Sequence, residues 1–193
     1  MEKDVQGRGG FDAWKLWFYF FVFAGVGWVM EVLVTMYISG GYFVNAGFLR
    51  GPWLPIYGVG AVLTAVIAKR VADTKWLFLV GFTLCGLGEY LTSLVLDLVY
   101  HAKWWDYSGW WLNIDGRTCV PVMIVFAMLV LAVAKVALPH LERLYKRFNQ
   151  KIFRAIMVAL IVAFFTDVAY SLWRPNLTEG MPERPGIVTA EEV

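Results

Sequence analysis

The segment that decides the fold is EYLTSLVLDLVYHAKWWDYSGWWLNIDGR, residues 89–117. It starts as an apolar helix with polar side chains at steps of four residues: Glu89, Ser93 and Asp97. Four residues advance a helix by slightly more than one turn, so these three side chains share one face. Carboxylates within an apolar span are costly in lipid and usually face a partner or a cavity. The pattern therefore predicts a membrane helix whose polar face points into the protein.

The second half of this segment is a polar loop that is rich in tryptophan. Its tryptophans, with one more from an earlier loop, are Trp53, Trp104, Trp105, Trp110 and Trp111. Tryptophan favours the boundary between membrane and water, so these residues are predicted to form an interfacial belt. The alternative is a wall that binds a cation or stacks on a sugar above the acids. His101 and Asp106 have no third ligand in the pattern, so we predict no metal and no cofactor.

The composition is that of a membrane protein. Of the 193 residues 60% are apolar and only 17% are charged, whereas soluble domains are about a quarter charged. We predict an all-α, polytopic transmembrane helical bundle in the cell membrane, with the lipid bilayer as its surroundings. Residues 1–174 are predicted to form a single domain, and residues 175–193 a disordered tail rich in proline and glutamate. From the charge pattern we predict that nucleic acid is not a partner.

About five apolar runs are long enough to be considered as spans. They cover residues 16–38, 53–68, 76–100, 119–138 and 152–173. The second run is the shortest and follows Gly51, Pro52 and Pro55. It is therefore either a tilted span or a half-helix that Gly51-Pro52 opens from a re-entrant loop.

The basic residues fix the predicted orientation. Twelve lie in the N-terminal segment and in the second and fourth loops: Lys3, Arg8, Lys15, Lys69, Arg70, Lys75, Lys135, Arg143, Lys146, Arg147, Lys151 and Arg154. Five lie on the other side: Arg50, Lys103, Arg117, Arg174 and Arg184. By the positive-inside rule the N-terminus is cytoplasmic and the C-terminus is outside. The fourth loop is predicted to form a short basic amphipathic helix that meets anionic lipid at the inner surface.

This topology brings three carboxylates to a similar depth. Glu31, Glu89 and Asp167 would each lie roughly 20–24 Å above the basic end of their span, at about 1.5 Å per residue. All three would then be in the outer half of a hydrocarbon core about 30 Å thick. Arg50 and Arg117, in the two outer loops, are the candidates to neutralise them. Two outcomes stay open: an ion-pair network that only packs the helices, or a pocket for a substrate, a cation or a proton.

Several stretches are similar to one bacterial family. The first is FVNAGFLRGPWLPIYGVGA (43–61), and the others are GEYLTSLVLD (88–97), WWDYS (104–108) and N-I-x-G-R-x-C (113–119). The GW-x-x-E of the first span fits as well. Across roughly residues 16–138 the chain resembles small multi-pass membrane proteins labelled putative ABC-transporter permeases. It departs from them at Ala46, where Arg is usual, and at Asp97, where Glu is common.

The resemblance implies transport, and an ABC permease needs a separate ATPase subunit. A bundle of this size also implies a homo-oligomer or a hetero-complex. The leading hypothesis is a transporter-type permease with an outward-facing polar site, and an enzymatic activity is less favoured. The predicted substrate-binding residues are Glu31, Asn45, Arg50, Glu89, Ser93, Asp97, Trp105, Asp106, Asn113 and Arg117.

Two alternatives remain. The first is a membrane-embedded enzyme acting on a lipid or a lipid-linked head group, with Glu89 or Asp106 as general base and Arg117 as electrostatic stabiliser. The second is a non-catalytic assembly or partner subunit, in which the acids serve helix packing.

Overall fold

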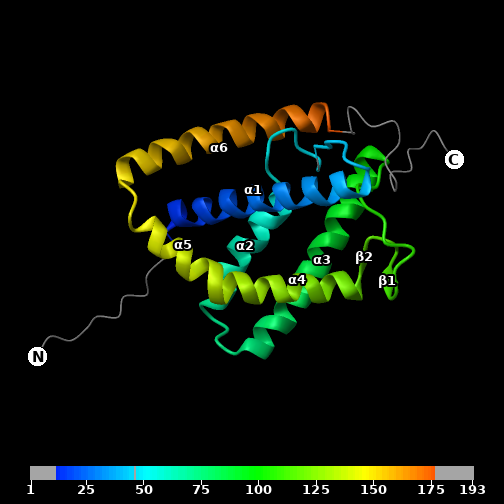
Figure 1. Ribbon diagram of the computed structural model, residues 1–193, viewed down its shortest axis with the longest axis horizontal. Coiled ribbons are helices and arrows are strands. Elements are labelled where there is room, and N and C mark those ends of the chain that lie inside the picture. The colour runs from blue at the N-terminus through cyan, green and yellow to red at the C-terminus, as the bar shows by residue number, and fades with distance from the viewer. Residues whose placement is uncertain (1–11, 46, 177–193) are drawn as a thin grey trace, which may run out of the picture.

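The computed structural model describes residues 12–45 and 47–176, so nearly all of the predicted tail lies outside the described residues. The fold is helical, with one small hairpin (Figure 1). The elements in order are α1 (Ala13–Ile38), α2 (Pro55–Ala68), α3 (Thr74–Tyr100), β1 (Asn113–Ile114), β2 (Thr118–Cys119), α4 (Val120–Ala132), a π-helical turn (Val133–Ala137), α5 (Leu138–Tyr145) and α6 (Gln150–Trp173).

Four helices of the described chain are long and apolar enough to cross a membrane. They are α1, α3, the continuous helix from Val120 to Tyr145, and α6. These helices confirm the all-α fold class and a multi-pass membrane protein. The second predicted span is α2, which has 14 residues and is therefore only about 21 Å long. It is short for a hydrocarbon core of about 30 Å, and it begins at Pro55 rather than at Gly51-Pro52.

Polar caps set where three of the spanning helices begin. The Asp12 carboxylate accepts a hydrogen bond from the Trp14 backbone N–H, Asp73 caps α3, and Asn149 caps α6. Each cap satisfies backbone donors that have no partner inside the helix. These starts lie slightly before the predicted ones because polar first turns belong to the helices.

The predicted end of the fourth span was wrong. The helix does not stop near residue 138 but continues through Pro139 to Tyr145, so the predicted amphipathic helix is largely the end of this span. In a regular helix a proline ring clashes with the carbonyl group four residues earlier. Here residues 133–137 form a π-helical turn that ends two residues before Pro139. In a π-helical turn each hydrogen bond spans five residues instead of four, so the backbone around the proline is wider and the helix continues.

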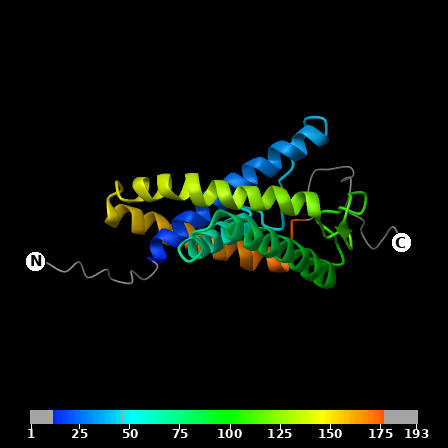
Figure 2. The same ribbon diagram turned by 90° about the horizontal axis from the view of Figure 1, so that it is seen from below.

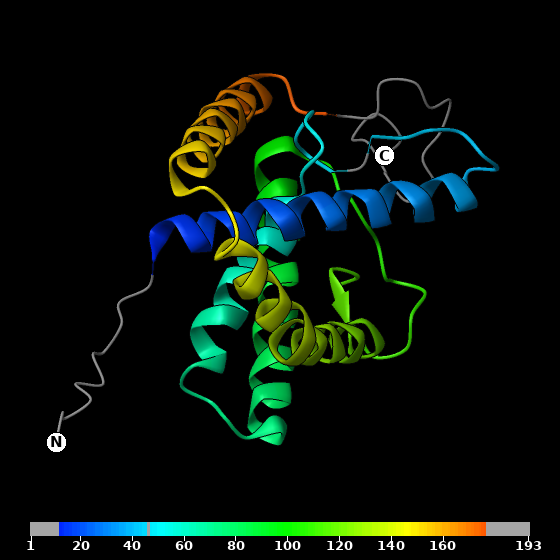
Figure 3. The ribbon, with the colours of Figure 1, turned by 60° about the vertical axis from the view of Figure 1, so that its left-hand side comes forward.

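Two unusual loops, residues 39–54 and 101–119, lie near the same end of the molecule, by the carboxyl ends of α1, α3 and α6 (Figure 1). Aromatic rings join them: Phe48 contacts both Tyr100 and Trp104. Figure 2 shows that the second half of α1 diverges from the other helices, and Figure 3 shows α1 crossing α3 steeply. Both loops therefore lie at one end of the molecule, and their placement outside the membrane stays a prediction.

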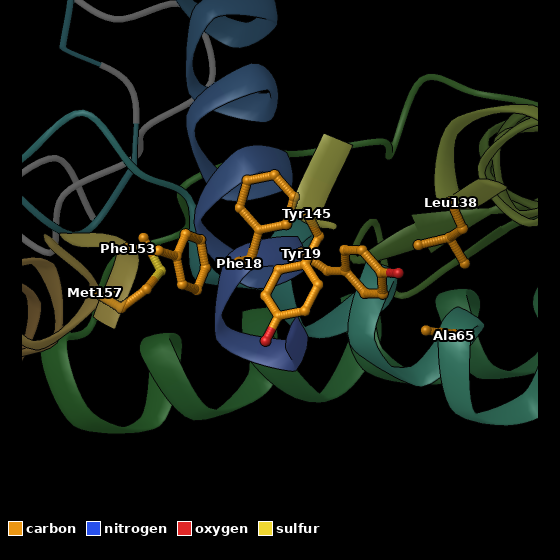
Figure 4. Packing of buried hydrophobic residues seen from close by; sticks show 7 residues of the cluster. All are labelled: Phe18, Tyr19, Ala65, Leu138, Tyr145, Phe153 and Met157. Carbon is orange, nitrogen blue, oxygen red and sulfur yellow. The ribbon is translucent and has the colours of Figure 1, made fainter. Parts of the chain in front are cut away.

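The opposite end is closed by an aromatic core where the start of α1 meets α5 and α6. Figure 4 shows its buried members: Phe18, Tyr19, Ala65, Leu138, Tyr145, Phe153 and Met157. The rings of Tyr145 and Phe153 meet edge to face, with centroids 5.1 Å apart. This packing brings the predicted cytoplasmic ends of four helices together.

Close contact between α1 and α2 depends on glycine. A Cβ atom at Gly27 would lie 2.4 Å from the Tyr57 ring, and one at Gly58 would lie 2.6 Å from Phe20. Both glycines therefore let the helices approach closely. Gly27 also leaves the space in which the Tyr57 hydroxyl reaches Glu31.

Candidate functional site

Glu89 lies in the carboxyl-terminal half of α3 and is 4% exposed. Its two carboxylate oxygens accept hydrogen bonds from two hydroxyl groups. Tyr107 donates to Oε1 over 2.9 Å, and Thr118 donates to Oε2 over 2.8 Å. Thr118 is itself buried, at the start of β2. Loop 101–119 therefore folds back onto the helix and closes over the carboxyl group.

Glu31, on α1, faces the same region. Its Oε1 atom accepts a hydrogen bond of 2.6 Å from the Tyr57 hydroxyl. The hydroxyls of Tyr57 and Tyr107 are each within electrostatic reach of both glutamates. We call Glu31, Tyr57, Glu89, Tyr107 and Thr118 the carboxyl–hydroxyl cluster. Within residues 12–45 and 47–176 neither glutamate forms an ion pair. The side chains that donate hydrogen bonds to the two carboxylates are hydroxyl groups.

An ion pair lies beside this cluster on the same face of α3. Arg117 binds Asp97 through Nη2 and Oδ2 at 2.6 Å, and its Nη1 donates to the Ser93 hydroxyl over 3.3 Å. Ser93 is fully buried. The polar face of Glu89, Ser93 and Asp97 therefore points into the protein as predicted, and residues 117 and 118 cover it.

Hydrogen bonds within loop 101–119 hold Tyr107 and Thr118 in place. The Trp105 indole N–H donates to the Arg117 carbonyl oxygen over 2.8 Å, and the Tyr107 N–H donates to the Gly116 carbonyl oxygen over 2.7 Å. β1 and β2 pair as an antiparallel hairpin. Its turn passes through Asp115 and Gly116, both with positive φ. The loop therefore has a defined conformation that is fixed by its own hydrogen bonds.

Asp167 lies in a second cluster, at the loop between α1 and α2. Its carboxylate accepts hydrogen bonds from the backbone N–H groups of Arg50 (3.3 Å) and Gly51 (2.9 Å). The Trp53 indole N–H donates to it over 2.7 Å, and Ser171 donates over 3.3 Å. Asp167 thus fastens α6 to this loop, and it does not share these partners with the other two acids.

Asn45 and Arg50 belong to this second region. The Trp28 indole donates to the Asn45 side-chain oxygen over 2.7 Å, and the Asn45 amide donates to the Arg50 carbonyl oxygen over 2.7 Å. The Arg50 guanidinium lies over the Tyr170 ring, 5.4 Å from its centroid. The structure therefore joins Asn45 and Arg50 with the end of α6.

The predicted site residues fall into three groups. The first group faces the interior beside loop 101–119: Glu31, Glu89, Ser93, Asp97 and Arg117. The second group is Asn45 and Arg50. Trp105, Asp106 and Asn113 shape the loop itself, since Asp106 accepts from the Ser108 N–H and hydroxyl and Asn113 donates to the Ser108 and Trp110 carbonyl oxygens.

Three members of the carboxyl–hydroxyl cluster were missed in the sequence: Tyr57, Tyr107 and Thr118. Two of them stand inside quoted motifs, PIYG and WWDYS, and the third lies between the arginine and the cysteine of N-I-x-G-R-x-C. Their place in those motifs was the available signal. Periodicity could not supply it, because two of the three lie outside regular helices.

The tryptophans do not form one belt. Trp110 and Trp111 are exposed, as expected at a membrane boundary. Trp53 instead packs between Phe21 and Phe164, where its N–H reaches Asp167. Trp104 packs against Phe48. In the described part of the chain no group of three or more His, Cys, Asp and Glu side chains could hold a metal ion.

The environment of Tyr107 gives a pH-dependent prediction. Burial, and next the nearby Glu89 carboxylate, raise the pKa of Tyr107 above its ordinary value of 10.0. The unfolded chain then loses this proton near pH 10, while the folded protein keeps it. The stabilisation is complete below pH 10 and declines as the pH rises above it.

We therefore expect Tyr107→Phe to lessen the alkaline loss of stability. Between pH 10 and 11 the wild type should lose at most about 1 kcal/mol more than this variant, measured by thermal unfolding in detergent. Tyr42→Phe, at an exposed tyrosine near the same end, is the matched control and should follow the wild type. Equal alkaline slopes for all three proteins would contradict the assignment.

The fold and the site define the class of protein. Several membrane-length helices surround a buried polar cluster, which is the arrangement of a multi-pass membrane protein. The sequence profile of a family described as "putative ABC-transporter type IV" matches residues 18–172. The chain belongs to this family, as its motifs predicted. Searches of curated proteins and of solved structures found no significant match.

Proposed function

We propose that this chain is a transporter permease in which Glu31 and Glu89 bind a proton or a small cation. The observation that carries the proposal is a pair of glutamates, inside membrane-length helices, whose hydrogen-bond partners are hydroxyls. A buried carboxylate requires a compensating charge as well as hydrogen bonds. Hydroxyl groups donate hydrogen bonds but carry no charge. A bound proton or cation would supply the charge.

The neighbouring ion pair supports a division of roles. Asp97 already has Arg117 at 2.6 Å, so it needs no further cation. Asp97 lies eight residues beyond Glu89, which is about 12 Å along the helix. On the predicted topology the pair would stand between the glutamates and the outer surface. The site would then be outward-facing, with the pair at its entrance.

The energy source and partners belong to the same proposal. Membership of an ABC-transporter family supports association with a separate ATPase subunit. A second copy of the chain would help to complete a pathway, since four spanning helices enclose little space. Co-purification of an ATP-hydrolysing subunit with the tagged protein would test the association with an ATPase. The mass of the tagged protein in nanodiscs would test the association with a second copy.

The binding role can be tested in lipid bilayers by infrared spectroscopy of the carboxyl groups. We expect a protonated-carboxyl band at neutral pH that Glu89→Gln or Glu31→Gln reduces, and that Na⁺ alters if the cluster also binds a cation. Glu142→Gln, an acid paired with lysines at the opposite end, is the matched control and should leave the band unchanged. Glutamine keeps the size and one acceptor oxygen, so the folded state should survive.

Two results would refute the binding role. One is a pair of glutamates that stay ionised at neutral pH and do not respond to Na⁺. The other is a Glu89→Gln protein that loses stability while its proton and Na⁺ responses match those of the wild type, which would show that the acids only pack helices.

The alternative of a lipid-modifying enzyme receives less support from the geometry. A general base must be accessible to its substrate. Glu89 is 4% exposed, which leaves no room for a lipid head group beside its carboxylate, while Asp106 holds the Ser108 hydroxyl. Mass spectrometry of bilayer lipids incubated with the protein should therefore show no new product.

A further inference from the structure

A group of large apolar side chains is exposed at the tip of loop 101–119. The group consists of Trp110, Trp111, Leu112 and Ile114, each between 47% and 72% exposed, and we call it the apolar finger. Residues 107–114 include no charged side chain. Single exposed apolar residues are common, whereas a contiguous group of them usually marks a contact with a membrane or with another protein. The finger is therefore a candidate contact surface.

The backbone of the finger has a fixed shape. The Asn113 amide donates to the carbonyl oxygens of Ser108 and Trp110 over 3.2 Å and 3.0 Å, and its side-chain oxygen accepts from the Gly116 N–H over 3.1 Å. Leu112 has a φ of 50°, which residues with a side chain rarely adopt. Such a conformation persists only where the surrounding structure fixes it. These bonds therefore hold the apolar side chains in their exposed positions.

The finger lies against the first residue of a membrane-spanning helix. The Val120 backbone N–H, at the start of α4, donates to the Leu112 carbonyl oxygen over 3.2 Å. Figures 1 and 2 both show the hairpin at this end of α4. About one turn further along the helix, Ile124 and Val125 are exposed, and exposed apolar side chains on a spanning helix face lipid. The finger is therefore close to the level at which lipid contact begins.

The chemistry of the finger fits the edge of the bilayer better than a protein partner. Tryptophan side chains prefer the boundary between lipid tails and head groups. A protein interface has a polar rim around its apolar core. The acids that flank the finger already have partners within the chain, since Asp106 accepts from the Ser108 hydroxyl and Asp115 from the Tyr90 hydroxyl. The bilayer is therefore the occupant that the finger favours.

The finger is attached directly to the two hydroxyls that bind Glu89. The rings of Trp110 and Tyr107 meet edge to face, with centroids 6.1 Å apart, and the Trp110 N–H donates to the Tyr107 carbonyl oxygen over 2.8 Å. Ile114 pairs with Thr118 across the hairpin. Tyr107 and Thr118 are the residues whose hydroxyls donate to Glu89. Each of these two residues therefore has a finger residue as its direct neighbour.

We propose that the apolar finger inserts into the edge of the bilayer and that this contact holds loop 101–119 closed over Glu89. Transfer of apolar side chains from water into lipid is favourable. The finger can stay inserted only while the hairpin keeps its place at the start of α4, so lipid contact favours the closed loop. The bilayer then forms part of the cover over the carboxyl–hydroxyl cluster, whatever Glu31 and Glu89 bind.

Photo-crosslinking identifies what the finger touches. The full chain carries p-benzoylphenylalanine in place of Trp111, is illuminated in phosphatidylcholine nanodiscs and is then weighed by mass spectrometry. We expect an adduct with the added mass of one phosphatidylcholine. The same group at Ile124, on α4, should also give this adduct, whereas at Arg147, exposed in the turn between α5 and α6, it should give much less. A doubled mass would assign the finger to a contact between two copies, and no adduct would place it in water. Either result would overturn the proposal.

Hydrogen exchange in the same nanodiscs tests whether the finger holds the loop closed. The readouts are two amides inside the loop: the Tyr107 N–H, bonded to the Gly116 carbonyl oxygen, and the Arg117 N–H, bonded to the Ile114 carbonyl oxygen. In Trp111→Ser/Leu112→Ser both should exchange at least about tenfold faster than in the wild type.

Two further variants separate lipid contact from general damage. Trp111→Phe/Leu112→Met keeps the finger apolar and should keep the wild-type exchange. Tyr42→Ser/Phe43→Ser removes two exposed apolar side chains from the other loop and should change exchange in loop 101–119 by less than about twofold. Wild-type exchange in Trp111→Ser/Leu112→Ser would show that the loop stays closed without the bilayer, and equal acceleration in the Tyr42 and Phe43 control would show that the effect is not specific to the finger. Both results would overturn the proposal.

Discussion

Replacing Arg117 with methionine is expected to lower the free energy of unfolding by about 2–4 kcal/mol. The Arg117 side chain is 12% exposed, and its partner Asp97 is 31% exposed. Removing the guanidinium leaves this partly buried carboxylate without its cation and the Ser93 hydroxyl without its donor. The partial exposure of Asp97 places the loss below that of a fully buried pair. Thermal unfolding in detergent, followed by tryptophan fluorescence, measures it.

A second change should reverse much of this loss. In the Arg117→Met background, Asp97→Asn removes the charge that was left unpaired, and we expect more than half of the stability to return. Lys103→Met removes a basic residue from the same loop and should change the stability by less than about 0.5 kcal/mol. If Asp97→Asn restores nothing, the arginine acts by some means other than pairing with Asp97.

Helical geometry explains why one part of this site was predictable. The angle between residues four apart is fixed in a helix, so the shared face of Glu89, Ser93 and Asp97 could be inferred from spacing alone. The partner of Arg117 did not follow from the spacing. Arg117 was expected to neutralise Glu31, Glu89 or Asp167, but it pairs with Asp97. Regular structure carried the prediction of the shared face, and the path of the loop decided which acid the arginine reaches.

Other parts could not be inferred, for definite physical reasons. Tyr107 and Thr118 reach Glu89 only because loop 101–119 closes through a hairpin with two positive-φ residues, and no periodic pattern encodes that path. The depth of Asp167 was estimated from its position along α6. The direction in which the Asp167 side chain points could not be inferred. Two of its donors are backbone N–H groups, which every residue except proline carries, so the residue types give no signal.

Replacing Asp167 with alanine is expected to give the largest loss of stability, about 3–5 kcal/mol. Four donors lose their acceptor: the backbone N–H groups of Arg50 and Gly51, the indole N–H of Trp53 and the hydroxyl of Ser171. Each buried donor left without a partner costs about 1–3 kcal/mol, and water recovers part of this at the exposed edge. The loop between α1 and α2 should detach from α6.

Trypsin offers a direct measurement of that detachment, because the peptide bond after Arg50 lies within the held segment. We expect Asp167→Ala to be cut there many times faster than the wild type, with the fragments identified by mass spectrometry. Asp167→Asn keeps one acceptor oxygen and should be intermediate. Thr166→Ala, at the adjacent residue, removes only a bond within the helix and should be cut at the wild-type rate. Resistance of Asp167→Ala to trypsin would show that other contacts hold the loop.

The same variant decides whether the two polar regions act independently. Asp167 bonds to the α1–α2 loop, whereas Glu89 bonds to loop 101–119, and the ring of Phe48 touches the second loop from the first. Distant sites without shared partners have additive effects within about 0.5 kcal/mol. We therefore expect the losses from Asp167→Ala and Arg117→Met to add in the double variant. A clear departure from additivity would mean that Phe48 couples the loops, and that releasing one loop also opens the cover over Glu89.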